Sequence, residues 1–195
     1  MSKKVILITG ANGEIGQSLI KNLNKQSIHN IIALDLENPT NNFNVEKFFI
    51  GSILDQKIID EINDKYEIYS IYHLAAILST KAEKNPKLAN DVNINGTINL
   101  LDLASSQSIK QSKNIKFFFP SSIAVYNVQQ GQKKEINEYE FCENPITEYG
   151  KAKLQCEKIG QEYENVDFRC IRFPGIISGT SIPTGGTSDF APEMI

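Results

Sequence analysis

The sequence is poor in the residues that build disulfide frameworks and metal sites. It has three cysteines, Cys142, Cys156 and Cys170, and only two histidines, His29 and His73. An odd number of cysteines forms no closed set of disulfides, and none of the three stands in a CxxC pair. A zinc site would have too few plausible ligands. We therefore expect free thiols in a reducing compartment and no metal.

Long apolar runs and an excess of one charge are also missing. The apolar run after the first lysines spans only residues 5–8, which is too short for the core of a signal peptide. No stretch approaches the roughly 18 apolar residues that a membrane span needs. The formal net charge of -3 predicts no basic surface for nucleic acid or an anionic membrane. These absences predict a cytoplasmic protein with neither of those partners.

What the sequence does contain is an alternation of short β-branched runs and longer segments of helical period. The expected strands are residues 5–8, 30–34, 47–50, 68–74, 116–119 and 166–173, and the expected helices are residues 14–24, 55–64, 85–106 and 146–163. Strands joined by crossover helices form a parallel sheet. The predicted fold class is therefore α/β, a Rossmann-type doubly wound parallel sheet with helices on both faces. Ligands of such a sheet bind at the carboxyl ends of its strands.

A glycine-rich turn follows the first strand. Gly10, Gly13 and Gly16 have GxxGxxG spacing, which permits a tight turn and leaves the N–H groups at a helix N-terminus to bind a pyrophosphate. Asp35 ends the second strand, where a carboxylate accepts hydrogen bonds from the adenosine ribose and repels a 2′-phosphate. Residues 36–38 contain no lysine or arginine that would favour NADP. The pattern predicts NAD, with a plain turn or capping aspartate as the alternative interpretation of Asp35.

Tyr149 and Lys153 are four residues apart, so a helix presents the phenol and the ammonium on one face. A free tyrosine has a pKa of about 10, whereas a base that works at neutral pH needs a pKa near 7. A nearby ammonium, together with the positive nicotinamide of NAD⁺, favours the phenolate. Ser122, at the end of the fifth strand, is positioned to hydrogen-bond the hydroxyl that is oxidised. Ser122, Tyr149 and Lys153 are thus the predicted catalytic residues of an alcohol oxidation or ketone reduction.

The order of these motifs resembles the extended short-chain dehydrogenase/reductase superfamily, the NAD-dependent epimerases and dehydratases, over residues 4–175. The segments His73-Leu74-Ala75-Ala76 and Asn93-Ile94-Asn95-Gly96-Thr97 match it as well. Besides the glycine turn, Asp35, Tyr149 and Lys153, the resemblance implies cofactor contacts from Asn12, Glu14, Ile15, Leu36, Ser52, Ile53, Leu74, Ala75, Ala76, Asn95 and Pro174.

Some of these positions carry a more specific expectation. Residues 74–76 should line the nicotinamide ribose, and Asn95 should be structural and water-binding rather than catalytic. His73 is expected to be a buried histidine at a strand end. Ser52 stands where the superfamily usually has an aspartate for the adenine amino group, so we expect weaker adenine binding.

Within the superfamily, three segments are similar to the short-chain type of L-threonine 3-dehydrogenase. They are residues 73–79 with 83–86, residues 120–126, and residues 172–178 with 183–190. The resemblance implies that Ser79 and Thr187 hold an amino-acid substrate, with Ser122 and Tyr149 on its hydroxyl. The implied reaction oxidises the C3 hydroxyl of threonine and yields 2-amino-3-oxobutanoate. A nucleotide-sugar epimerase or dehydratase and a non-catalytic NAD-binding protein remain as alternatives.

Two further expectations concern size and assembly. Members of the superfamily are longer, so the C-terminal substrate lobe is expected to be largely missing and activity to be impaired. Residues 1–175 would form the NAD-binding domain, and residues 176–195 the start of a truncated substrate-binding region. The resemblance also implies a homodimer in which helix 85–106 and the helix with Tyr149 pair across a two-fold axis.

Overall fold

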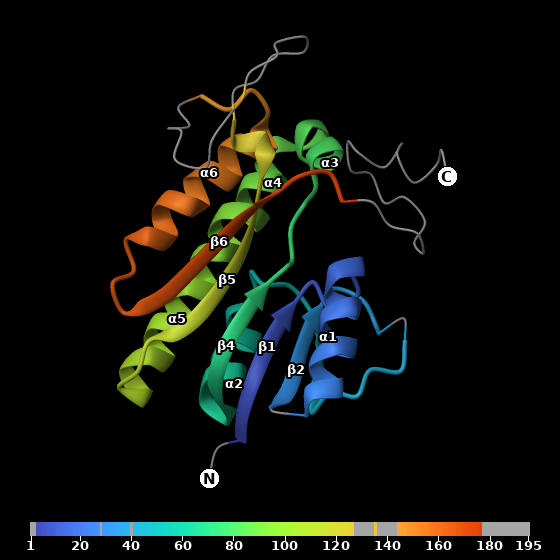
Figure 1. Cartoon of the computed structure of the whole chain (residues 1–195), viewed down its shortest axis with the longest axis vertical. Coiled ribbons are helices and arrows are strands. Elements are labelled where there is room, and N and C mark those ends of the chain that lie inside the picture. Colours follow the sequence, from blue (N-terminus) through green and yellow to red (C-terminus); the bar gives the residue numbers. More distant parts are fainter. Residues whose placement is uncertain (1–2, 28, 40, 127–134, 136–143, 177–195) are drawn as a thin grey trace.

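Six strands form one parallel sheet in the order β3-β2-β1-β4-β5-β6 (Figure 1). The computed structural model describes residues 3–27, 29–39, 41–126, 135 and 144–176. The strands are β1 (Lys3–Thr9), β2 (Asn30–Asp35), β3 (Lys47–Ile50), β4 (Tyr66–His73), β5 (Ile115–Ser122) and β6 (Val166–Phe173). The chain reverses its direction across the sheet between β1 and β4, which is where ligands bind in sheets of this kind. The predicted Rossmann-type fold is confirmed.

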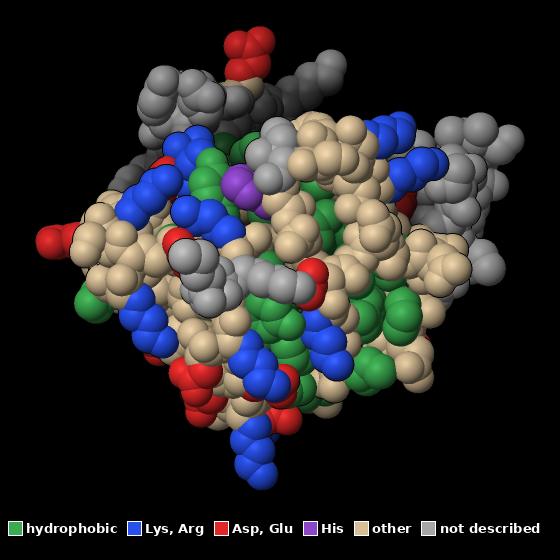
Figure 2. All heavy atoms as spheres, turned by 90° about the horizontal axis from the view of Figure 1, so that it is seen from below, with side chains coloured by type: hydrophobic (Ala, Val, Ile, Leu, Met, Phe, Trp, Pro, Cys, Tyr) green, Lys and Arg blue, Asp and Glu red, His purple; other side chains and the backbone are tan. Residues whose placement is uncertain are grey.

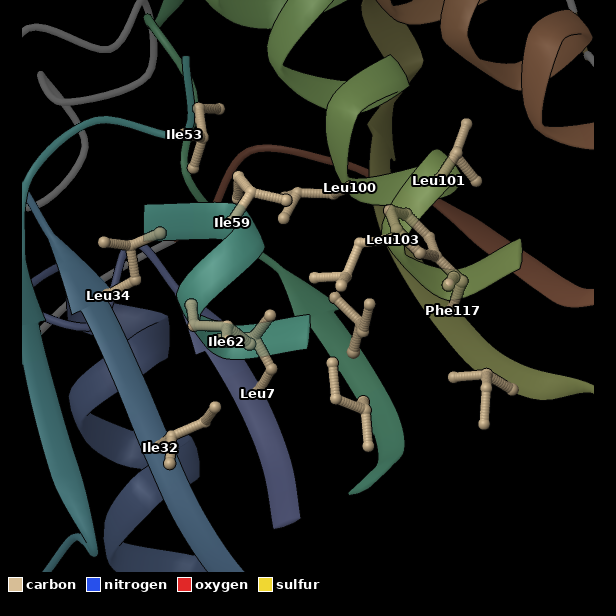
Figure 3. Close-up of a cluster of buried hydrophobic side chains, with 14 of the residues drawn as sticks. Leu7, Ile32, Leu34, Ile53, Ile59, Ile62, Leu100, Leu101, Leu103 and Phe117 are labelled. Carbon is tan, nitrogen blue, oxygen red and sulfur yellow. The ribbon is translucent and has the colours of Figure 1, made fainter. Parts of the chain in front are cut away.

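Helices cover both faces of the sheet. They are α1 (Glu14–Gln26), α2 (Gln56–Lys65), α3 (Ser79–Lys84), α4 (Pro86–Asn90), α5 (Gly96–Gln111) and α6 (Glu148–Gln161), with a short 3-10 helix η2 (Ile123–Val125). On one face, Ile59 and Ile62 of α2 and Leu100 of α5 pack against strand residues such as Leu7 (Figure 3). On the other face, Ile20 of α1 packs on β1 and β2. Within the described residues no helix is long and apolar enough to cross a membrane.

The helix predicted over residues 85–106 is interrupted. It is divided into α4, a π-helical turn η1 (Asp91–Asn95) and α5, and the unpredicted α3 precedes it. In η1 the carbonyl oxygen of Asn93 accepts hydrogen bonds from the Thr97 hydroxyl at 2.6 Å and the Cys156 thiol at 3.1 Å. Side-chain donors of this kind compete with helical N–H groups and bend helices. Hydrophobic periodicity therefore located the helical region but did not reveal its break.

His73 links β4 to its neighbours. It is 2% exposed, and its two ring nitrogens each lie 2.9 Å from a hydroxyl oxygen, one of Thr9 and one of Thr97. Burial, with a smaller contribution from the charge of Lys153, lowers the pKa of His73 to about 3. The ring is therefore neutral at pH 7. The predicted buried histidine at a strand end is confirmed, and it connects β1, β4 and α5.

The amino ends of the strands form the face shown in Figure 2, where basic and acidic side chains lie among one another. Lys4 Nζ is 3.4 Å from a carboxylate oxygen of Glu67. The ammonium groups of Lys113 and Lys116 each lie 5.4 Å from the centre of the Tyr69 ring. This face is opposite to the strand ends that carry the predicted site residues.

We predict that stability depends on pH through His73. Its folded-state pKa lies below that of an unfolded histidine, so between about pH 6.5 and 3 the unfolded chain binds one more proton. The free energy of unfolding should fall as pH is lowered through this window, by up to about 1.4 kcal/mol per pH unit from this group. Chemical denaturation at a series of pH values measures the slope. His73→Gln should give a shallower slope whatever its own stability, and an unchanged slope would contradict the assignment.

Candidate active site

The candidate site is built from the segments that follow β1, β2, β4, β5 and β6 at one edge of the sheet (Figure 1). Among the predicted cofactor contacts, Glu14, Ile15 and Gly16 form the first turn of α1, Leu74, Ala75 and Ala76 follow β4, and Pro174 follows β6. Ser79, predicted to contact substrate, begins α3. Thr187, the other predicted substrate contact, lies outside the described residues.

The glycine turn packs directly on the segment after β4. Gly10 has a φ of +69°, and a Cβ there would lie 2.6 Å from the backbone nitrogen of Ala75, so only glycine fits. Helix α1 follows Gly13, which provides no side-chain cap, whereas Asp55 caps α2 and Thr147 caps α6. The N–H groups in the first turn of a helix can bind a phosphate. The turn therefore fits the pyrophosphate of NAD.

Asp35 holds this turn in place. Its Oδ2 accepts a hydrogen bond from the Asn12 N–H at 2.8 Å, and its Oδ1 accepts one from the Leu36 N–H at 2.7 Å. The Asn12 side chain donates to the carbonyl oxygens of Glu37 and Asn38 at 3.1 and 3.0 Å. Asp35 is thus a turn residue in the chain itself. A carboxylate has about four lone-pair sites, so acceptors remain for ribose hydroxyls.

Ser52 and Ile53, two predicted cofactor contacts, both make contacts within the chain itself. The Ser52 hydroxyl accepts a hydrogen bond from the Leu54 N–H at 3.1 Å and so stabilises the turn after β3. Ile53 is 4% exposed and packs against Gly96 in the core, while its carbonyl oxygen accepts a hydrogen bond from Asn99 at 3.1 Å. The Ile53 side chain is therefore a core residue, and only its backbone is left for a cofactor.

Of the two asparagines in η1, Asn93 rather than Asn95 holds the site together. Asn93 is 4% exposed, and its side chain accepts from the Ile77 N–H at 2.8 Å and donates to the Ile77 carbonyl at 3.0 Å. Asn95 is exposed and donates to the Asp91 carboxylate at 3.3 Å. Asn93 therefore has a structural role that the sequence analysis did not assign, and the structural and water-binding role of Asn95 stays a prediction. The π-helical turn rotates these residues about the helix axis, which helical periodicity does not reveal.

Ser122, Tyr149 and Lys153 come together where β5 ends. The Ser122 hydroxyl accepts a hydrogen bond from the Ala124 N–H at 3.1 Å, which starts η2. A Cβ on Gly150 would lie 2.2 Å from the Ala124 carbonyl oxygen, so α6 begins in direct contact with this turn. On α6, the Lys153 ammonium lies 5.6 Å from the centre of the Tyr149 ring. The helix that carries Tyr149 and Lys153 therefore packs against the turn after Ser122, at one corner of the sheet edge.

Burial controls the ionisation of this corner. It raises the pKa of Tyr149 to about 12 and lowers the pKa of Lys153 to about 8. At pH 7 the phenol is therefore protonated, and most of Lys153 is charged. The ammonium donates a hydrogen bond to the Pro120 carbonyl at 2.7 Å instead of bonding the phenol. The charge of Lys153 therefore does not offset the effect of burial on the pKa of the Tyr149 phenol.

Glu83 supports the helix that carries Tyr149, a role that the sequence analysis did not predict. Its carboxylate, on α3, accepts hydrogen bonds from the N–H groups of Glu148 at 2.7 Å and Tyr149 at 3.4 Å. An anion at a helix N-terminus is stabilising. Glu83 thereby joins the segment after β4 to the helix that carries Tyr149. Its role depends on a contact across 66 residues, which local spacing does not show.

The thiols of Cys156 and Cys170 are free, as predicted. Among the residues that the structure describes, no group of three or more histidine, cysteine, aspartate or glutamate side chains could hold a metal ion.

Comparison with known sequences gives a family match over residues 6–195, to the NAD dependent epimerase/dehydratase family. An uncharacterised epimerase/dehydratase of Staphylococcus aureus strain USA300 is 36% identical over 98% of this chain and 59% of its own length. The chain thus spans about three fifths of the curated relatives that it matches.

Solved structures of similar proteins also match most of this chain and a little over half of their own length. An L-threonine 3-dehydrogenase from a metagenome, described as monomeric, is 41% identical with a TM-score of 0.84 and is matched over 97% of this chain and 59% of that one. The L-threonine dehydrogenase of Clostridium difficile is 35% identical with a TM-score of 0.83, over 99% and 60%. A UDP-glucose 4-epimerase of Brucella ovis in complex with NAD is 27% identical with a TM-score of 0.72, over 87% and 51%. The chain belongs to the NAD dependent epimerase/dehydratase family.

Proposed function

We propose that this chain is the NAD-binding and catalytic part of a cytoplasmic L-threonine 3-dehydrogenase, which oxidises the C3 hydroxyl of threonine to give 2-amino-3-oxobutanoate. The observation that carries the proposal is the contact of α6, which carries Tyr149 and Lys153, with the turn that follows Ser122 at the end of β5. The choice of threonine is supported by the threonine dehydrogenase structures, which are 31 to 41% identical to this chain.

The residues of the chain divide the task between them. The uncapped start of α1 and the carboxylate of Asp35 would hold the pyrophosphate and ribose of NAD, which accepts a hydride when bound. Ser122 would hydrogen-bond the substrate hydroxyl, and Tyr149 as phenolate would take its proton. Lys153 keeps a positive charge near the phenol and so favours the phenolate. Most of the transition-state stabilisation would come from this fixed arrangement.

We also propose a homodimer formed through α5 and α6. The exposed positions of α6 include Lys151, Gln155 and Lys158, so such an interface would be polar. Light scattering at concentrations of tens of micromolar should give twice the mass of the chain. A strict monomer at low salt would contradict the proposal, and it would match the description of the metagenome relative as monomeric.

Cofactor choice is a second expected outcome. NAD⁺ should bind at least about tenfold more tightly than NADP⁺, because the Asp35 carboxylate repels a 2′-phosphate. Isothermal titration with both cofactors measures the ratio. Asp35→Asn should reduce the ratio, whereas the matched exchange Asp60→Asn on the exposed surface of α2 should leave it unchanged. Equal affinities of the unaltered chain for both cofactors would contradict the role of Asp35.

The reaction gives a third prediction. Threonine-dependent formation of NADH should be slow in this chain and faster in a version extended to the length of its relatives, because a closing lobe excludes water. Tyr149→Phe should abolish it while leaving NAD⁺ affinity within about twofold, since most of the predicted cofactor contacts are made by other residues. Tyr163→Phe removes a hydroxyl that donates to Asp102 at 2.8 Å and serves as the matched control with unchanged activity.

The same assay distinguishes the other candidate functions. Turnover of UDP-sugars but not threonine by the extended protein would favour the epimerase or dehydratase alternative, which the shared family supports. Tight NAD⁺ binding with no turnover of either substrate would favour a non-catalytic NAD-binding protein.

A further inference from the structure

Glu157 lies one helical turn after Lys153 on α6 and is 4% exposed. Its two carboxylate oxygens accept hydrogen bonds from Arg172 of β6, from Nε at 3.0 Å and from Nη2 at 2.7 Å. One of the same oxygens also accepts a hydrogen bond from the Ser121 hydroxyl. A buried carboxylate with three donors from two different strands joins α6 to the ends of β5 and β6.

The partner on β5 is next to a predicted catalytic residue. Ser121 directly precedes Ser122, and it directly follows Pro120, whose carbonyl oxygen accepts the hydrogen bond from Lys153. Helix α6 therefore holds the end of β5 at two successive residues. Because successive side chains of a strand alternate in direction, fixing Ser121 also fixes the rotation of the strand and with it the direction of Ser122.

Arg172 extends this contact to the far end of the turn. Its Nη1 donates to the hydroxyl oxygen of Tyr126 at 3.0 Å, and its guanidinium lies 4.9 Å from the centre of that ring. Tyr126 is the residue after η2, and Ser122 is the residue before it. The pair Glu157–Arg172 thus holds the short turn from both sides, at Ser121 and at Tyr126.

A buried ion pair is weak support for stability in general, because apolar residues of similar size often stabilise a protein equally well. Its contribution here is geometric, since a bidentate guanidinium and carboxylate allow little freedom of orientation. Glu157 and Arg172 lie close to the predicted catalytic residues through Ser121, the neighbour of Ser122. Glu157 forms no hydrogen bond with Ser122, Tyr149 or Lys153.

We propose that Glu157 is a positioning residue: through Ser121 and Arg172 it fixes the Ser122 turn against the helix that carries Tyr149 and Lys153. The inference rests on the function proposed above for the same corner. Glu157 also adds a negative charge to the surroundings of Lys153. The other titratable groups around Lys153 are Tyr149 and Cys156 on α6 and His73 at the end of β4, and Arg172 faces Glu157 from β6.

The test compares Glu157→Gln with the matched control Glu162→Gln, an exposed position at the end of α6. In the threonine assay of the extended protein, Glu157→Gln should lower kcat by about tenfold to a hundredfold, because displaced catalytic groups are costly. The KM for NAD⁺ should change by less than about twofold, since Glu157 does not face the predicted pyrophosphate site.

The pH profile is a second readout of the same variant. Its alkaline limb should move to lower pH, because loss of the negative charge favours neutral Lys153. Glu162→Gln should behave as the unaltered protein.

A second variant covers the case in which Glu157→Gln does not fold. Ser121→Ala removes only the bond to β5 and keeps the ion pair with Arg172, so it should fold and should lower kcat by a smaller factor at unchanged KM. In the double variant the two losses should not add, because both remove the same contact. Unchanged kcat and an unchanged pH profile in both single variants would overturn the proposal.

A measurement without turnover separates this inference from the proposed function. NMR titration of the Lys153 side chain in the 195-residue chain should show a lower pKa in Glu157→Gln than in the unaltered chain. If the extended protein does not oxidise threonine but this difference is found, the substrate assignment fails and the influence of Glu157 on Lys153 stands. If threonine is oxidised and neither the titration nor kcat changes, Glu157 has only a structural role.

Discussion

All-parallel strand pairing is the constraint on which the rest of the structure depends. Each strand must return through a crossover before the next parallel strand can pair, so the segments after the carboxyl ends collect at one edge of the sheet. The glycine turn after β1, Asp35 at the end of β2 and Ser122 at the end of β5 lie along that one edge although they are far apart in the sequence. The apolar core beneath them holds helices and sheet together, but hydrophobic burial is non-directional and does not orient these segments.

Orientation comes from polar groups buried between the elements. Within the described residues, every buried side-chain nitrogen or oxygen has a hydrogen-bond partner. Asn93 holds the segment after β4, His73 joins β4 to β1 and α5, and Glu157 joins α6 to β5 and β6. An unpaired buried polar group costs about 1–3 kcal/mol, so each of these contacts penalises any shift of the segment that it holds. The candidate site is thereby attached to the sheet by directional contacts.

Much of this arrangement was predictable because it has a local signature. The GxxGxxG turn, the strand periodicity and the spacing of Tyr149 and Lys153 depend on residues close in sequence. The structure agrees on the fold, and it packs the helix that carries Tyr149 and Lys153 against the turn that follows Ser122. The interrupted helix over residues 85–106 has no such signature, because its break arises where Thr97 and Cys156 compete for one carbonyl oxygen. The structural role of Asn93, which lies in this turn, has no local signature either.

The sequence by itself determined the order of strands and helices, the residue types at their ends and hence the kind of chemistry that the sheet edge offers. Only the tertiary structure decided which carboxylates support that edge and how its groups ionise. Glu83 and Glu157 act through contacts with residues distant in the sequence or on other strands. The local spacing of residues does not predict such contacts. The pKa of Tyr149 rises to about 12 because burial removes water from the phenol. The burial of a side chain is defined only after the chain has folded, so the sequence does not predict this shift.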